Sequence, residues 1–295
     1  MRPFEYFEPT TLEEAVTLLG RYHGQASLLA GGTDLLVEIK EQLRQPNYVI
    51  NLKKIPGLDQ LVYDEEQGLS LGALVTVRRV ETSAIVAKNY AGLAQAARDL
   101  ASIQIRCRAT VAGNICRASP SADTLPPLMA AGASVKLFGP RDERIIPLED
   151  FFTGPGQTIL AQDEILTHII IPSPPDGTGQ VYLKHGRRQA MELATVGVAV
   201  SLTMAGERCE ASRIVLGAVA PTPIRARRAE QLLAGQIVEP AAIAAAAAAA
   251  QAEARPISDV RSSAEYRREM VEVLTRRALS EAVKRAGGRD GETNN

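Results

Sequence analysis

The residues best suited to chemistry lie in the stretch LLAGGTDLL at positions 28–36. An apolar run there leads into Gly31 and Gly32, and the pair Thr33 and Asp34 then opens a helix-like segment. Paired glycines let the backbone bend and bring its N–H groups close to an anion, and a helix N-terminus carries partial positive charge. The stretch is therefore typical of a phosphate-binding loop, with an ordinary turn as the alternative.

A second stretch, TVAGNICRASPSAD at 110–123, repeats this form. Small residues lead to Gly113, which lets a ligand approach the backbone closely, and to Asn114, whose amide can bond phosphate or ring atoms. A dinucleotide carries two phosphates, so two such loops on one chain are what it requires. We expect the two loops to converge on a single diphosphate.

Two carboxylates accompany these loops, and the residues alone leave their roles open. Asp34 and Asp123 could each cap the helix that follows or accept hydrogen bonds from sugar hydroxyls. The AGGTDLL loop lacks the G-x-G-x-x-G fingerprint with an acidic residue about twenty positions later, and it lacks the Lys-Ser/Thr pair of a P-loop. The two commonest signatures of a phosphate loop are thus absent from it.

Cysteine and histidine usage argues against a metal site held by the protein alone. The three cysteines form an odd, scattered set that matches no disulfide framework and no zinc or iron–sulfur spacing; they are Cys107, Cys116 and Cys209. The three histidines also lie far apart. We expect the cysteines to be small buried hydrophobic residues, and any redox chemistry to come from an organic cofactor.

The composition is that of an ordinary soluble globular protein. The chain has 295 residues, of which 45% are hydrophobic and 23% charged, so it can bury a sizeable core in two or three subdomains. Its formal net charge of -1 argues against a nucleic-acid or anionic-membrane partner. No targeting segment or transmembrane run is recognisable. We expect a cytoplasmic protein, with any association with the inner face of the membrane made through partners.

The N-terminal part alternates strands and helices within about fifty residues. The expected elements are a short strand at 4–7, a helix that Thr10 or Thr11 caps, a strand at 26–30, a helix at 35–43 and a strand at 47–52. This order predicts a small α/β subdomain over residues 1–55. The first glycine loop would lie at the carboxyl end of a strand, where ligands collect in such sheets.

The remaining chain divides at SPPDGTG, residues 173–179, which concentrates Pro, Gly and Asp between two apolar strands. We expect a second α/β subdomain over 56–172 and a C-terminal domain over 179–286. The expected helices lie at 75–87, 89–101, 123–133, 225–235, 240–254 and 264–286, and the expected strands at 58–62, 69–77, 135–138, 144–152, 164–172, 181–186, 194–204 and 209–219. The polar tail 287–295 is expected to be disordered.

Several stretches, taken in order, carry a family resemblance. They are FEYFEPTTLEEAVTLL, AGGTDLL, VINLKKIPGLDQL with LGALVTV, TVAGNICRASPSAD and EILTHIIIP. Their order and spacing resemble the FAD-binding medium subunit of the molybdenum hydroxylases, a family that includes the flavoprotein subunits of aerobic carbon monoxide dehydrogenase and bacterial xanthine dehydrogenase. The resemblance covers residues 2–285. It implies an α+β fold: an FAD-binding domain of the vanillyl-alcohol-oxidase (PCMH) type in two α/β subdomains, and a C-terminal domain of a three-stranded antiparallel sheet with helices.

The same resemblance implies a set of FAD-binding residues and no catalytic residue or metal ligand. The loop that matches 29–35 would hold the pyrophosphate, and the loop that matches 109–114 would wrap the other side. Leu166 and Lys184 fall where the family lines the flavin or adenine region, with plain core and a surface cation as the alternatives. The implied residues are Leu29, Ala30, Gly31, Gly32, Thr33, Asp34, Leu35, Leu100, Ala109, Thr110, Gly113, Asn114, Cys116, Asp123, Leu166 and Lys184.

The chain departs from the family pattern at three points. Many relatives have Gly where this chain has Ala112, which adds one methyl group. Leu100 stands where the animal xanthine enzymes place an aromatic residue over the flavin, which argues against NAD as the acceptor. No cysteine-rich insertion interrupts the middle subdomain, so we expect no additional iron–sulfur cluster.

The resemblance implies an electron-transfer subunit. A large partner with a molybdenum cofactor would oxidise the substrate, and a small 2Fe-2S partner would pass the electrons on. FAD on this chain would deliver them to quinone, NAD or oxygen, in a dimer of heterotrimers. Two alternatives are a stand-alone flavin oxidoreductase of the same fold, which needs a substrate pocket with a proton donor, and a nucleotide-binding assembly module without redox activity.

Overall fold

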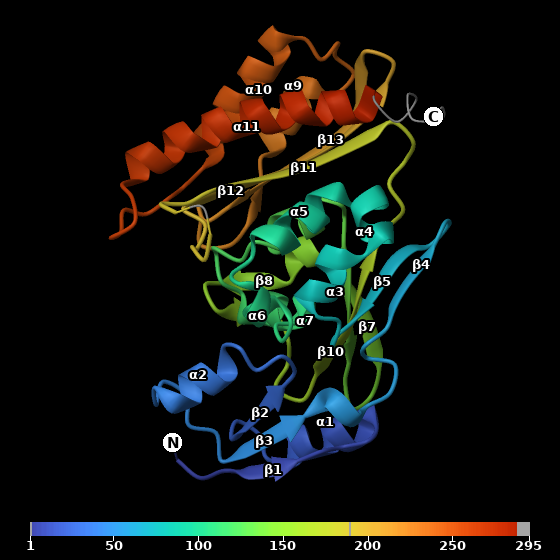
Figure 1. The fold of residues 1–295 in the computed structure, drawn as a ribbon, viewed down its shortest axis with the longest axis vertical. Helices are drawn as coiled ribbons and strands as arrows, with labels where there is room; N and C mark the ends of the chain where they lie inside the picture. The colour runs from blue at the N-terminus through green and yellow to red at the C-terminus, as the bar shows by residue number, and fades with distance from the viewer. Residues whose placement is uncertain (1, 189, 288–295) are drawn as a thin grey trace.

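The computed structural model describes residues 2–188 and 190–287, and it arranges them in three bodies (Figure 1). The N-terminal body (residues 2–55) lies at the bottom of Figure 1, the middle body (56–172) in the centre, and the C-terminal body (178–287) at the top. No helix in these described ranges is both long and apolar enough to cross a membrane.

The N-terminal body is the predicted small α/β unit. Its elements are β1 (Glu5–Phe7), α1 (Leu12–Arg21), β2 (Ala26–Leu29), α2 (Leu35–Lys40) and β3 (Tyr48–Asn51), followed by the short 3₁₀ turn η1 (Leu52–Lys54). The three strands are parallel in the order β1-β3-β2. Thr11 caps α1 by accepting a hydrogen bond from the Glu14 N–H, and Glu14 reaches back to the Thr10 N–H. This reciprocal capping explains why the helix begins where the sequence predicted.

The helix expected at 35–43 is shorter than predicted. It ends at Lys40, and the next turn places Gln42 at a φ of 61° so that the chain can reach β3. Leu43 is therefore 80% exposed, and Leu36 is 42% exposed. Within α2 only Leu35 and Ile39 are buried.

The middle body is built on a five-stranded antiparallel sheet in the order β4-β5-β10-β6-β7. Its strands are β4 (Leu61–Asp64), β5 (Gly68–Gly72), β6 (Ser134–Phe138), β7 (Glu143–Pro147) and β10 (Ile165–Ile171), with a small hairpin of β8 (Phe152–Gly154) and β9 (Gln157–Thr158) after the turn η2 (Leu148–Asp150). Its helices are α3 (Val77–Thr82), α4 (Ala84–Asn89), α5 (Ala91–Asp99), α6 (Ile103–Arg106), α7 (Val111–Arg117) and α8 (Leu125–Ala130).

One predicted helix, at 75–87, is two helices in the structure. Ser83 has extended backbone angles, ends α3 and caps α4 by accepting a hydrogen bond from the Val86 N–H. A serine that bonds the backbone locally competes with helix continuation, which explains the break.

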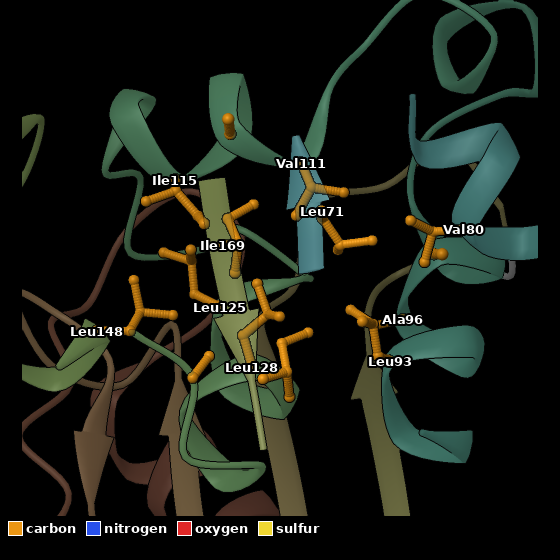
Figure 2. Close-up of a cluster of buried hydrophobic side chains, with 14 of the residues drawn as sticks. Leu71, Val80, Leu93, Ala96, Val111, Ile115, Leu125, Leu128, Leu148 and Ile169 are labelled. Atoms are coloured by element: carbon orange, nitrogen blue, oxygen red, sulfur yellow. The ribbon is translucent and has the colours of Figure 1, made fainter. Parts of the chain in front are cut away.

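The core of the middle body joins its sheet to its helices. Figure 2 shows Leu71 and Ile169 of the sheet beside helix residues such as Val111, Ile115 and Leu125, and all five are fully buried. The same core extends into the C-terminal sheet, where it takes in Tyr182, Ala199 and Val215. The two bodies therefore pack on each other through apolar side chains.

The C-terminal body confirms the three predicted long antiparallel strands and adds a short fourth. Its elements are β11 (Thr178–His185), β12 (Val196–Ala205), β13 (Arg208–Gly217), β14 (Ile224–Arg225), α9 (Arg227–Leu233), α10 (Pro240–Glu253) and α11 (Ala264–Gly287). α11 lies along the outer face of the sheet (Figure 1). Leu274 and Leu279 of α11 are buried, whereas Tyr266 is 43% exposed. Gly287 ends α11, and the rest of the expected tail lies outside the described residues.

Candidate functional site

The two glycine loops touch each other. The first leaves β2 after Leu29, and the second follows α6 and opens α7. A Cβ atom on Gly31 would lie 2.9 Å from the Ala109 Cα and closer still to the carbonyl oxygen of Arg108. Residue 31 therefore has to be glycine for the loops to pack this closely. The two loops therefore lie together, as their predicted convergence on one diphosphate requires.

The first loop presents a row of N–H groups without acceptors. No residue that the structure describes accepts a hydrogen bond from the N–H groups of residues 31–35. Asp34 occupies the N-cap position of α2, but its side chain makes no capping hydrogen bond, so the capping alternative for Asp34 is wrong. Successive free N–H groups in a bend are a binding place for an anion.

The second loop satisfies most of its own backbone, with only the N–H groups of Thr110 and Ala112 lacking an acceptor among the described residues of 109–114. The Thr110 hydroxyl accepts from the Gly113 N–H at 3.0 Å, and the Thr110 carbonyl accepts from the Asn114 N–H at 3.0 Å. The Val111 N–H donates to the Val75 carbonyl at 3.2 Å, which ties the loop to the start of α3. The Thr124 hydroxyl lies 2.6 Å from the Asn114 Oδ1, leaving the Asn114 Nδ2 group as the free donor.

Two cationic residues lie beside the loops, and neither belongs to the set of FAD-binding residues expected from the sequence. Arg108 directly precedes Ala109, and Lys53 follows β3 and donates to the Asn51 Oδ1 at 3.3 Å. Burial lowers the pKa of Lys53, and the nearby positive charge of Arg108 lowers it further. A bound anion would relieve this repulsion. Both residues stand outside the glycine motifs, so only the fold shows that they are close.

Asp123 and Lys184 form a buried ion pair across the seam between the middle and C-terminal bodies. Lys184 Nζ donates to the Asp123 Oδ2 at 2.8 Å and to the Asp99 carbonyl at 3.1 Å. The Tyr182 hydroxyl donates to the Asp123 Oδ1 at 2.9 Å. Asp123 is only 5% exposed, and burial raises its pKa although Lys184 opposes the rise.

These contacts correct two alternatives. Asp123 does not cap a helix, because the N-cap of α8 is Thr124. The side chain of Thr124 makes no capping hydrogen bond. Lys184 is not a surface cation, because its side chain is 11% exposed. Two residues proposed on separate grounds are therefore direct partners.

Arg106 supports the turn that carries Leu100. Its Nη1 donates to the carbonyls of Arg98, Leu100 and Ala101 at 2.9–3.3 Å, and its Nε donates to Glu81 at 2.9 Å. The turn needs this support because Ala101 has a φ of 45°, which costs a non-glycine residue energy. No motif in the sequence singled out Arg106.

The remaining residues that were expected to contact FAD differ in solvent exposure. Leu100 and Leu166 are 7% and 3% exposed and belong to the core of the middle body. Cys116 lies exposed on α7, and Cys107 is also exposed, so the expectation of buried cysteines holds only for Cys209. α7 buries only Val111, Ala112 and Ile115, and Cys107 is the C-cap of α6, a helix with no buried residue, so both thiols lie outside the core.

Comparison with known proteins adds two matching family models. Residues 2–174 match the FAD binding domain in molybdopterin dehydrogenase, and residues 181–282 match the CO dehydrogenase flavoprotein C-terminal domain. The chain is 35% identical over 279 residues to the carbon monoxide dehydrogenase medium chain of Hydrogenophaga pseudoflava, covering 95% of this chain and 96% of that protein. It is 32% identical over 285 residues to the xanthine dehydrogenase FAD-binding subunit of Escherichia coli O157:H7, covering 96% and 97%.

Solved structures agree with this similarity. Carbon monoxide dehydrogenase from Hydrogenophaga pseudoflava superposes with a TM-score of 0.92 at 36% identity, covering 97% of this chain and 99% of that chain. Quinoline 2-oxidoreductase from Pseudomonas putida 86 superposes with a TM-score of 0.90 at 30% identity, covering 97% and 98%.

Proposed function

The chain belongs to the FAD-binding subunits of the molybdenum hydroxylases, and from this premise we propose that it relays electrons from a partner iron–sulfur subunit to an external acceptor. It is a subunit of an oxidoreductase, and FAD is its cofactor. When bound, the flavin supplies the capacity to take up and release electrons. The protein contributes binding, orientation and electrostatics.

The observation that carries this proposal is the row of unsatisfied N–H groups at residues 31–35, packed against the second loop. We assign the FAD diphosphate to this row, because hydrogen bonds from N–H groups to a charged oxygen are the strong kind. Lys53 and Arg108 offset its negative charge. Gly113 and Asn114 approach it from the second loop.

The full set of residues that we assign to the cofactor keeps the sequence-based set and enlarges it. Leu100 and Leu166 lie in the core and form a supporting wall, whereas Asp123 and Lys184 present a fixed charge pair at the seam. The set is Leu29, Ala30, Gly31, Gly32, Thr33, Asp34, Leu35, Lys53, Leu100, Arg108, Ala109, Thr110, Gly113, Asn114, Cys116, Asp123, Leu166 and Lys184.

We assign the chain two partners, a large subunit with the molybdenum cofactor and a small 2Fe-2S subunit, in a dimer of heterotrimers. The medium-chain relatives from Hydrogenophaga pseudoflava and Afipia carboxidovorans support a multi-subunit assembly. In this arrangement the substrate is oxidised on the large partner, and quinone, NAD or oxygen receives the electrons.

The test is affinity purification of the tagged chain from cells that express it with its neighbouring genes. The proposal predicts a yellow preparation with about one FAD per chain and two co-purifying subunits, one with molybdenum and one with iron and sulfide. The proposal fails if the chain elutes alone and does not bind added FAD. Steady-state turnover of a substrate by the isolated chain would instead favour the stand-alone flavin oxidoreductase.

A further inference from the structure

A cavity of about 640 Å³ opens at the seam between the middle and C-terminal bodies, beside the linker that joins β10 to β11. Its walls come from residues 172–175 of the linker, the end of α8, the strands β11 to β13, and α9. None of its lining residues belongs to either glycine loop. Its volume is within the range of about 300–1,000 Å³ that small-molecule sites occupy.

The inner face of the C-terminal sheet changes character where this cavity begins. Tyr182, Ala199 and Val215 lie opposite one another on adjacent strands and pack into the core of the middle body. The neighbouring row on the same face, which begins two residues earlier in β11, consists of Gln180, Ser201 and Arg213. All three line the cavity, so the sheet presents a polar row to it.

Gln180 is a buried amide without a partner. The residue is 7% exposed, and its side chain forms no hydrogen bond with any residue that the structure describes. The polar atoms of this side chain are not completely inaccessible to solvent. Because Gln180 lines the cavity, the cavity is where these atoms can contact solvent or a ligand. An amide at such a depth lowers stability unless something in the cavity bonds to it.

Arg213 is an exposed residue that lies in the same row as this amide, two strands away on β13. The other arginines of the cavity are paired: Arg225 binds Glu230 at 2.7 Å, and Arg225 and Arg227 both lie 3.3 Å from Glu149. Arg213 forms no ion pair with any described residue.

The guanidinium group of Arg213 lies against Gly132, where an added Cβ would be 3.0 Å from the Arg213 Cζ. The group is thereby held at the edge of the cavity. Gly132 belongs to the middle body, so this contact also places Arg213 at the seam between the two bodies.

We propose that this cavity binds a small oxyanion, a molecule with a phosphate or carboxylate group. Arg213 supplies the charge and the planar donor pair that fits such a group. The Gln180 amide and the Ser201 hydroxyl supply neutral hydrogen bonds. Because the ligand would contact the linker and both bodies, its binding stabilises their packing.

The experiment uses the FAD-loaded protein, so that the anion cannot enter the cofactor site. Inorganic phosphate and citrate are titrated by calorimetry at fixed ionic strength, with chloride as the reference. Wild type should bind one of the two anions saturably, at one per chain. Arg213→Gln and Gln180→Leu should each weaken binding by about tenfold or more. Arg141→Gln, on an exposed arginine outside the cavity, should not.

Two results would overturn the proposal: no saturable binding of either anion at millimolar concentration, or equal affinity in wild type, Arg213→Gln and Gln180→Leu. Flavin absorbance is recorded for each variant. It reports the cofactor site separately, so failure of the anion site leaves the proposed electron-relay function to its own test.

Discussion

In the first glycine loop the N–H groups of residues 31–35 have no acceptor among the described residues, whereas in the second loop Thr110 alone accepts from the N–H groups of Gly113 and Asn114. The two loops look alike in sequence, with small residues, glycine and a helix start. In the structure the first loop has no acceptor for any N–H group of residues 31–35, whereas the second lacks one only for Thr110 and Ala112 among residues 109–114.

This difference separates two roles. A loop that satisfies its own backbone is stable without ligand and can act as a frame, while a loop with free donors gains most when an anion arrives. The second loop is tied to α3 and to Thr124, and the first packs on it through Gly31. We therefore regard the second loop as the support and the first as the receptor for the diphosphate.

The largest expected effect comes from forcing the loops apart. In Gly31→Ala the new Cβ would collide with the backbone of Arg108 and Ala109. Losing two hydrogen bonds to a charged diphosphate, at about 1.5 kcal/mol each, lowers FAD affinity by about a hundredfold or more. The flavin-to-protein absorbance ratio after gel filtration measures this. Gly20→Ala, at a helical position with open space around it, should keep its FAD; a fully loaded Gly31→Ala protein would refute the close packing of the loops.

The next effect concerns the frame behind the second loop. Lys184→Met leaves the buried Asp123 carboxyl without its cation, which costs about 3–5 kcal/mol of unfolding free energy. Urea denaturation measures the loss. Glu272→Gln breaks the helix-surface pair with Arg276 and should cost about 0.3–0.5 kcal/mol. Similar losses in both variants would show that the seam pair is not a structural support.

A matched pair of threonine variants tests the two roles directly. Thr110→Ala removes the cap of α7 and should lower the unfolding free energy of the apoprotein by about 1 kcal/mol. Thr33→Ala removes a hydroxyl that bonds nothing described, so it should change that free energy by less than about 0.5 kcal/mol while weakening FAD binding several-fold. The reverse pattern would assign the roles the other way round.

The smallest expected effect is a pH dependence. Burial raises the pKa of Asp123 in the folded state, so the native protein keeps this proton at pH values where the unfolded chain has lost it. Its contribution to stability is full below the ordinary aspartate pKa and falls as the pH rises toward the raised value, by at most about 1.4 kcal/mol per pH unit. The unfolding free energy of wild type minus that of Asp123→Asn should decline as the pH rises from 4 to 7. A difference that increases with pH would show that the pKa of Asp123 is lowered in the folded state.

Local signals in the sequence were enough for much of the framework. The Thr11 cap, the parallel N-terminal unit and the three long C-terminal strands follow from capping residues and from periodicity. The predicted helix across Ser83 failed because a serine can cap a helix as well as continue one. The predicted C-terminal boundary of α2 was wrong because the path of the chain to β3, rather than helix propensity, determines where the helix ends.

The site was predictable only in part. The glycine loops could be found because glycine pairs have local meaning, and their contact through Gly31 agrees with that prediction. The pairing of Asp123 with Lys184 joins residues 61 positions apart, and Lys53, Arg106 and Arg108 act through the fold rather than through a motif. Such contacts carry no local signal. The sequence therefore left capping open for Asp123 and surface exposure open for Lys184, and the structure excludes both.

The central claim, that the N–H groups of residues 31–35 bind the FAD diphosphate, can be tested by hydrogen–deuterium exchange of the apo and FAD-loaded protein. The account predicts that FAD slows exchange markedly in peptides that cover 30–36 and changes it little at Gly113 and Asn114, whose N–H groups already have acceptors. Slowed exchange at 110–114 with none at 30–36 would contradict it.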